Sequence, residues 1–200
     1  MVDGKDPRPM LEVVKGGLSC EIFFPPLWII AAPKDNPPFP VDAFAFEEDT
    51  FLVLSADTTV RDPKIPLVRI MTRLIETQPQ VPGKVLVRGT APARLLAIVH
   101  DLNQEPSWKK EWVEKALEGI LRAAEGRNFQ AIALPLLGSV HGAMDNDRFV
   151  SLLGGILKRT PLHHLKRLWL IVPKGKAQAI IASLRAMLGV SRQDEAFPSK

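Results

Sequence analysis

The sequence predicts a single α/β domain: a three-layer α/β/α arrangement around a mixed, mostly parallel sheet, with an added β-hairpin at the amino end. Two observations predict this class. Short apolar runs that end at proline or glycine alternate with longer amphipathic stretches, most regularly in the second half of the chain. The 200 residues are 46% hydrophobic and 24% charged, which is enough for one sizeable core. Helices that alternate with strands imply that both faces of the sheet are covered.

The elements of the first half are predicted to be mostly strands. Gly16-Gly17 separates two apolar stretches and suits the positive φ angles of a two-residue turn. This predicts a hairpin over residues 11–24, which Pro25-Pro26 ends. Asp62-Pro63 places a capping residue and a proline where a helix begins, and we predict that this helix continues to Thr77. The other strands of this half are predicted at residues 27–32, 41–46 and 50–54.

The second half alternates more regularly. Ser107 is predicted to cap a helix that ends at Gly126, and Asp147 a helix that continues to residue 159. Gly154-Gly155 inside the second helix lowers its stability, which indicates close packing against another backbone. The remaining elements are predicted as strands at residues 84–88, 94–102, 129–136 and 165–172, and as a final helix that ends at Gly189.

Composition limits the location and the partners. We expect residues 1–10 to be disordered and residues 191–200 to form a flexible tail, with one domain over residues 11–190. No apolar run is long enough to cross a bilayer, and the amino end has no hydrophobic signal region, so we predict a cytoplasmic protein with no membrane partner. The only cysteine is Cys20, which excludes an intrachain disulfide and a cysteine-based zinc site. The eighteen prolines suggest a thermophilic source.

The charge pattern argues against a nucleic-acid partner. The net charge is +4 and the pI is near 9.3, but lysine and arginine are spread along the chain rather than gathered on one basic face. The pattern favours an ordinary solvated surface. An apolar hairpin over residues 11–24 is compatible either with an extension of the sheet or with pairing in a homo-oligomer, and the sequence leaves both open.

The most informative motif follows the strand predicted at residues 129–136. The strand stops at Pro135 and leads into Gly138-Ser139-Val140-His141-Gly142, and a helix comes soon afterwards. A strand, a glycine turn and a helix in this order expose backbone N–H groups at the carboxyl edge of a sheet, where anionic ligands bind. Glycines at such a turn also occur for backbone geometry alone. We predict that residues 138–142 form a phosphate-binding loop.

The same region resembles a known family. Residues 83–89 and the strand Ala93-Arg94-Leu95-Leu96-Ala97-Ile98-Val99-His100 are similar to the middle of macro domains. The helix, the proline-ended strand and the glycine loop follow in the order that this family uses. The resemblance covers residues 83–172, and the match over residues 27–82 is loose. It implies the macro fold, in which this loop wraps the diphosphate of ADP-ribose with backbone amides.

Departures from the family pattern imply a degenerate cleft. The loop after Pro135 is one residue shorter than the pattern and lacks its middle glycine, so the Cβ of Val140 obstructs a phosphate. No glycine occurs between residues 18 and 82, so the second phosphate loop of the family is absent. Asp42 and Phe44 lie in a stretch that resembles a family strand and are further cleft candidates. Asp57 precedes the corresponding helix, and its carboxylate would repel a diphosphate.

These observations predict a macro-like module that binds ADP-ribose or a related nucleotide diphosphate, without hydrolase activity. No cofactor, metal or catalytic residue is predicted. Asp145 and Asp147 near His141 favour helix capping over a metal site. Ser139 near His141 lacks an acid that would orient a base, and His100 is interpreted as a satisfied residue near the core. The alternative is a non-catalytic structural or protein-interaction domain that has lost its ligand.

Overall fold

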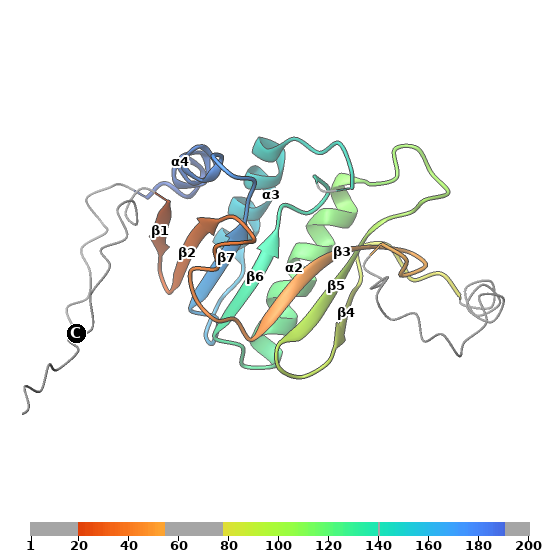
Figure 1. Cartoon of the computed structure of the whole chain (residues 1–200), viewed down its shortest axis with the longest axis horizontal. Coiled ribbons are helices and arrows are strands. Elements are labelled where there is room, and N and C mark those ends of the chain that lie inside the picture. The colour runs from red at the N-terminus through yellow and green to blue at the C-terminus, as the bar shows by residue number, and fades with distance from the viewer. Residues whose placement is uncertain (1–19, 55–77, 140, 191–200) are drawn as a thin grey trace, which may run out of the picture.

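A computed structural model describes residues 20–54, 78–139 and 141–190. They form a seven-stranded sheet in the order β1-β2-β7-β6-β3-β5-β4 (Figure 1). Neighbouring strands are parallel from β2 to β5, and the edge strands β1 and β4 are antiparallel to their neighbours. This confirms the predicted α/β class with a mixed, mostly parallel sheet. The strands are β1 (Glu21–Phe24), β2 (Leu27–Ala32), β3 (Ala43–Asp49), β4 (Val85–Arg88), β5 (Ala93–His100), β6 (Ala131–Pro135) and β7 (Arg167–Ile171).

The helices of the described residues lie together behind the sheet in the view of Figure 1. They are α2 (Lys110–Gly126), α3 (Asn146–Arg159) and α4 (Ala177–Leu188). Their apolar stripes share one buried cluster with alternate residues of the strands, because side chains of a strand point to opposite faces in turn. The helix predicted over residues 62–77 lies outside the described residues. So do residues 1–10, 191–200 and the first strand of the hairpin predicted over residues 11–24.

A second, smaller cluster lies on the opposite face of the sheet. Trp169 stands between two residues of the main cluster in β7, so strand alternation turns its side chain to the other face. Its ring lies edge-on to Phe44 with 6.0 Å between centroids, and its indole Nε1–H donates a hydrogen bond of 3.0 Å to the backbone oxygen of Ala32. Burial of the indole therefore leaves its polar atom satisfied.

The strand predicted over residues 50–54 is wrong, because a side chain organises this segment as a turn. Asp49 is fully buried, and its carboxylate accepts hydrogen bonds from the backbone N–H groups of Phe51 (2.6 Å), Val53 (2.8 Å) and Leu54 (2.9 Å). Leu52 lies between them with a φ of 64°. These N–H groups serve a carboxylate, so they cannot form a strand ladder.

Two helix starts also differ from the prediction. The N-cap of α2 is Lys109 and not Ser107, whose hydroxyl lies 3.2 Å from Nδ1 of His100 instead. The N-cap of α3 is Asp145, whose side chain makes no cap hydrogen bond. Asp147 lies inside the first turn of α3, and its carboxylate accepts a hydrogen bond from the Ser183 hydroxyl of α4. Ser107 and Asp147 are therefore engaged in tertiary contacts rather than in capping.

The end of α4 and the close packing at Gly154 agree better with the prediction from the sequence. The α4 helix ends at Gly189, which has the left-handed φ of 73° that glycine tolerates. A Cβ on Gly154 would overlap Cγ of Met187, so α3 and α4 do pack closely there. The contact is with a side chain and not with the backbone that we predicted. Gly155 has no atom within 4 Å of such a Cβ.

A carboxylate joins the end of α2 to the segment that enters β7. Glu125 accepts hydrogen bonds from the backbone N–H groups of His163 (2.9 Å), His164 (3.1 Å) and Leu165 (2.9 Å), and lies 3.3 Å from the His164 ring. Burial raises the pKa of Glu125, but the three N–H donors and the ring outweigh it and lower this pKa to about 2.

Candidate ligand-binding site

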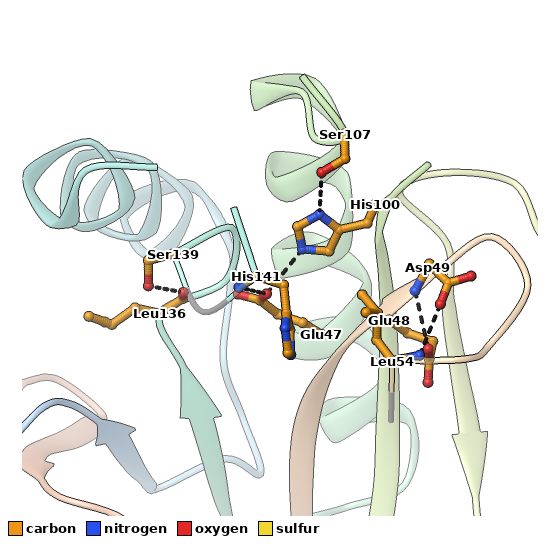
Figure 2. Close-up of polar contacts among 9 residues, drawn as sticks. All are labelled: Glu47, Glu48, Asp49, Leu54, His100, Ser107, Leu136, Ser139 and His141. Carbon is orange, nitrogen blue, oxygen red and sulfur yellow. Dashed lines mark hydrogen bonds and ion pairs between the residues drawn. The ribbon is translucent and has the colours of Figure 1, made fainter. Parts of the chain in front are cut away.

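The candidate site lies where β3, β5 and β6 end. These strands are parallel, so their carboxyl ends share one edge of the sheet. The predicted phosphate loop follows β6 at this edge, and Figure 2 shows His100 and Glu47 between it and Ser107. None of the described helices is long and apolar enough to cross a membrane. Nor do the described residues hold a group of three or more His, Cys, Asp or Glu side chains that is placed to bind a metal ion.

The loop after β6 is folded tightly onto itself. Gly138 has a φ of 82°, which favours glycine, and its carbonyl accepts a hydrogen bond of 3.1 Å from the Met144 N–H. Ser139 donates to the carbonyl of Leu136 both from its N–H (3.0 Å) and from its hydroxyl (2.5 Å). A Cβ on Gly142 would lie 2.5 Å from the carbonyl oxygen of Gly138. Both glycines are therefore required by the backbone geometry of the loop.

Trp108 supports this loop from the side. A Cβ on Gly142 would lie 2.6 Å from Cδ1 of Trp108, so the half-buried indole packs directly against the loop backbone. The guanidinium carbon of Arg148, in the first turn of α3, lies 5.7 Å from the centre of the same ring. This arrangement brings a cation close to the loop.

Some backbone donors of this region have no acceptor within the described residues. The N–H groups of Gly142 and Ala143 make no hydrogen bond there, and the first turn of α3 has no side-chain cap. The α3 helix has 14 residues, so its amino end carries a partial positive charge that favours anions. These groups give the segment from Gly142 to the start of α3 the chemistry of an anion site.

A buried carboxylate occupies another donor of the loop. Oε2 of Glu47, at the carboxyl end of β3, lies 3.1 Å from the backbone nitrogen of His141 and 3.0 Å from Nε2 of His100. Glu47 is 5% exposed and His100 is 0% exposed. The His100 ring reaches the Ser107 hydroxyl through its other nitrogen, at 3.2 Å. His100 is therefore the satisfied buried residue that the sequence predicted, and it is part of the site.

Sequence reasoning missed the contacts of Glu47. Its partners lie 53 and 94 residues away along the chain. A signal was present: three consecutive acids, Glu47-Glu48-Asp49, end an apolar strand, and Asp49 stands opposite His100 in the register of β3 and β5. Acids at a buried strand end need partners, and the neighbouring strand end supplies one.

The other predicted site residues do not all come together. Gly138, Ser139, His141 and Gly142 lie in one loop. Asp42 lies at the amino end of β3, the opposite edge of the sheet, where its carboxylate accepts the N–H groups of Gln130 (2.7 Å) and Ala131 (3.0 Å). Phe44 follows in the amino half of β3 and packs on Trp169. Val140 and Asp57 lie outside the described residues.

Comparison with solved structures gives the fold. A mutant macrodomain of Oceanobacillus iheyensis with ADPR superposes with a TM-score of 0.62 and covers 86% of this chain and 98% of its own, at 9% identity. This chain has the macro domain fold. The same macrodomain with ADP gives a TM-score of 0.62 at 9% identity, over 84% of this chain and 95% of that one. The macrodomain of Thermus aquaticus DarG superposes with a TM-score of 0.51 at 17% identity, and the match covers 72% of this chain and 98% of that one.

The fold resemblance predicted from residues 83–172 is thereby confirmed at the level of structure. No family model and no curated protein matches the sequence. At 9–17% identity the macro fold is shared, while the residues that face a ligand have to be judged on the contacts of this chain itself.

Proposed function

We propose that this chain is a binding module for ADP-ribose or a related nucleotide diphosphate, and that the ligand's phosphates bind at residues 138–143 and the start of α3. The observation that carries the proposal is the pair of N–H groups of Gly142 and Ala143, which find no acceptor among the described residues, beside a helix start without a side-chain cap. Arg148 over Trp108 adds a nearby cation. The Oceanobacillus iheyensis macrodomain, which shares this fold, has been solved with ADPR and with ADP, and this supports the choice of ligand class.

We propose binding without hydrolase chemistry. Glu47 and His100 are an acid and a base beside the loop, and both are buried and hydrogen-bonded to each other. A general acid or base has to come within hydrogen-bond reach of the reacting group. Engagement of both side chains inside the protein supports a site that holds its ligand without cleaving it.

The test is calorimetric titration of ADP-ribose to millimolar concentration against the wild-type chain, Gly142→Ala and Gly155→Ala. The methyl group of Gly142→Ala meets the loop backbone and Trp108, so this variant should bind at least about tenfold more weakly, which corresponds to about 1.4 kcal/mol. Gly155→Ala adds the same methyl group to α3, where no atom lies within 4 Å, and should bind like the wild type. Absence of heat with the wild-type chain would refute the proposal.

A second candidate function is a structural or protein-interaction domain that no longer binds a nucleotide. The occupation of loop donors by the chain's own acids favours it: Glu47 holds the His141 N–H, and Asp49 holds three N–H groups after β3. This candidate predicts no binding of ADP-ribose by the wild-type chain and no difference between Gly142→Ala and Gly155→Ala in the same titration.

A further inference from the structure

We propose that Glu47 is a specificity-determining residue, which rests on the function proposed above. Its buried carboxylate occupies the His141 N–H, so one phosphate of a nucleotide diphosphate is held at Gly142 and Ala143 while the second gains no donor at His141. The proposal follows from one geometric fact. A single carboxylate oxygen lies within hydrogen-bond distance of both the loop amide of His141 and the imidazole of His100.

A ligand can use only those N–H groups of the loop that the protein itself leaves without an acceptor. Loop amides bind phosphate only when their N–H groups are not already engaged. The His141 N–H donates to Glu47 at 3.1 Å, and the Ser139 N–H donates to Leu136 at 3.0 Å. The N–H groups of Gly142 and Ala143 are the adjacent ones with no acceptor within the described residues. Two neighbouring N–H groups and a helix start suit one phosphate.

A second phosphate at the His141 N–H would bind at a cost in free energy. If the phosphate displaced Glu47 from the N–H, it would remove a hydrogen-bond donor from a carboxylate that is only 5% exposed, which is unfavourable. If Glu47 stayed in place, two anions would share one donor, and like charges in a buried setting repel strongly. Both routes weaken the binding of a diphosphate.

The charge of Glu47 can be removed without changing the size of its side chain. Glu47→Gln keeps the size of the side chain and an oxygen that accepts the His141 N–H, and it removes the negative charge. Asp42→Asn makes the same change at the opposite edge of the sheet, on a carboxylate that accepts the backbone N–H groups of Gln130 and Ala131. The pair therefore separates the local effect of a charge at the loop from the general effect of one acid fewer.

The experiment is calorimetric titration of ADP-ribose and of AMP against the wild-type chain, Glu47→Gln and Asp42→Asn. We expect Glu47→Gln to bind ADP-ribose about tenfold or more tightly than the wild type, to improve AMP binding by less than about threefold, and Asp42→Asn to change neither. Equal affinity of the wild type and Glu47→Gln for ADP-ribose would overturn the inference and leave the proposed function intact. Binding by Glu47→Gln alone would support the inference and refute nucleotide binding by the wild type. No binding by any variant would refute both.

A measurement on the wild-type chain keeps the inference testable if Glu47→Gln does not fold. Amide signals in ¹⁵N-correlated NMR spectra report the environment of each N–H group. AMP should shift the signals of Gly142 and Ala143 and leave that of His141 in place. A shift of the His141 amide by AMP as large as those of Gly142 and Ala143 would overturn the inference.

Discussion

Glu125→Gln is expected to destabilise the fold in a pH-dependent way. Glu125 lies in the last turn of α2, where the helix dipole disfavours a carboxylate. It is stabilised there because three consecutive backbone N–H groups, from His163 to Leu165, donate to it. The substitution removes the charge that strengthens these hydrogen bonds and so weakens the link between α2 and the segment entering β7.

The magnitude follows from the pKa. Lowering the pKa of Glu125 from its ordinary value of 4.5 to about 2 corresponds to at most about 3 kcal/mol of stability. The side chain is 16% exposed and its partners lie at the surface, so solvent screening reduces the expected loss to about 1–2 kcal/mol. Because the folded-state pKa is the lower one, this stabilisation is complete above pH 4.5 and is lost as the pH falls toward 2.

The assay is urea unfolding followed by tryptophan fluorescence at pH 7, 4 and 3. The difference in free energy of unfolding between the wild type and Glu125→Gln should be about 1–2 kcal/mol at pH 7 and should shrink between pH 4 and pH 3. Glu118→Gln is the matched control on the same helix, because it loses only a surface ion pair with Arg159, which contributes about 0–1 kcal/mol. A difference that does not shrink on acidification, or one no larger than that of Glu118→Gln, would refute the reasoning.

Two further predictions concern stability and need only thermal or urea unfolding. Gly155→Ala should raise the free energy of unfolding by about 0.5–1 kcal/mol, because alanine favours the helix and meets no atom there. Gly154→Ala should gain less, because Met187 must move aside; an equal gain would contradict the close packing of α3 on α4. Asp49→Asn should cost about 2–3 kcal/mol, because three charge-assisted hydrogen bonds to a buried carboxylate are weakened together. A loss below about 0.5 kcal/mol would show that the turn forms without the charge.

The elements that the sequence predicted well are those whose signal is local. The strands β5, β6 and β7 are continuous apolar runs, and the end of α4 carries a glycine where the backbone turns left-handed. Residues 50–54 show where local signals fail. Thr50 to Leu54 has the β-branched and apolar residues of a strand, and one buried carboxylate turns it into a loop. The β-propensity of residues 50–54 contains no information about one side chain, that of Asp49, which accepts hydrogen bonds from three of their backbone N–H groups.

The glycine loop of the candidate site was predictable from the sequence, and the contacts around it were not. The glycine loop could be located because Pro135, Gly138 and Gly142 mark a strand end and a turn in the sequence itself. The role of Glu47 could not, because it depends on a β3 strand end meeting a β5 strand end and a β6 loop. Pairs that are distant along the chain become visible only once the strand order is known.

The fold and the ligand preference of this chain therefore depend on different features of its sequence. A superposition that covers 98% of a macrodomain at 9% identity shows that this fold forms from largely different residues, because many combinations of apolar side chains can fill such a core. In the proposed site, phosphate recognition would depend on far fewer groups, namely a small number of backbone N–H donors and the acid beside them. A change at one position, such as an acid at residue 47, can then alter ligand preference while the sheet and helices stay as they are. We can test this by comparing the affinities of the wild type and Glu47→Gln for ADP-ribose. If the two proteins are equally stable, a difference in affinity shows that residue 47 alters ligand binding without altering the fold.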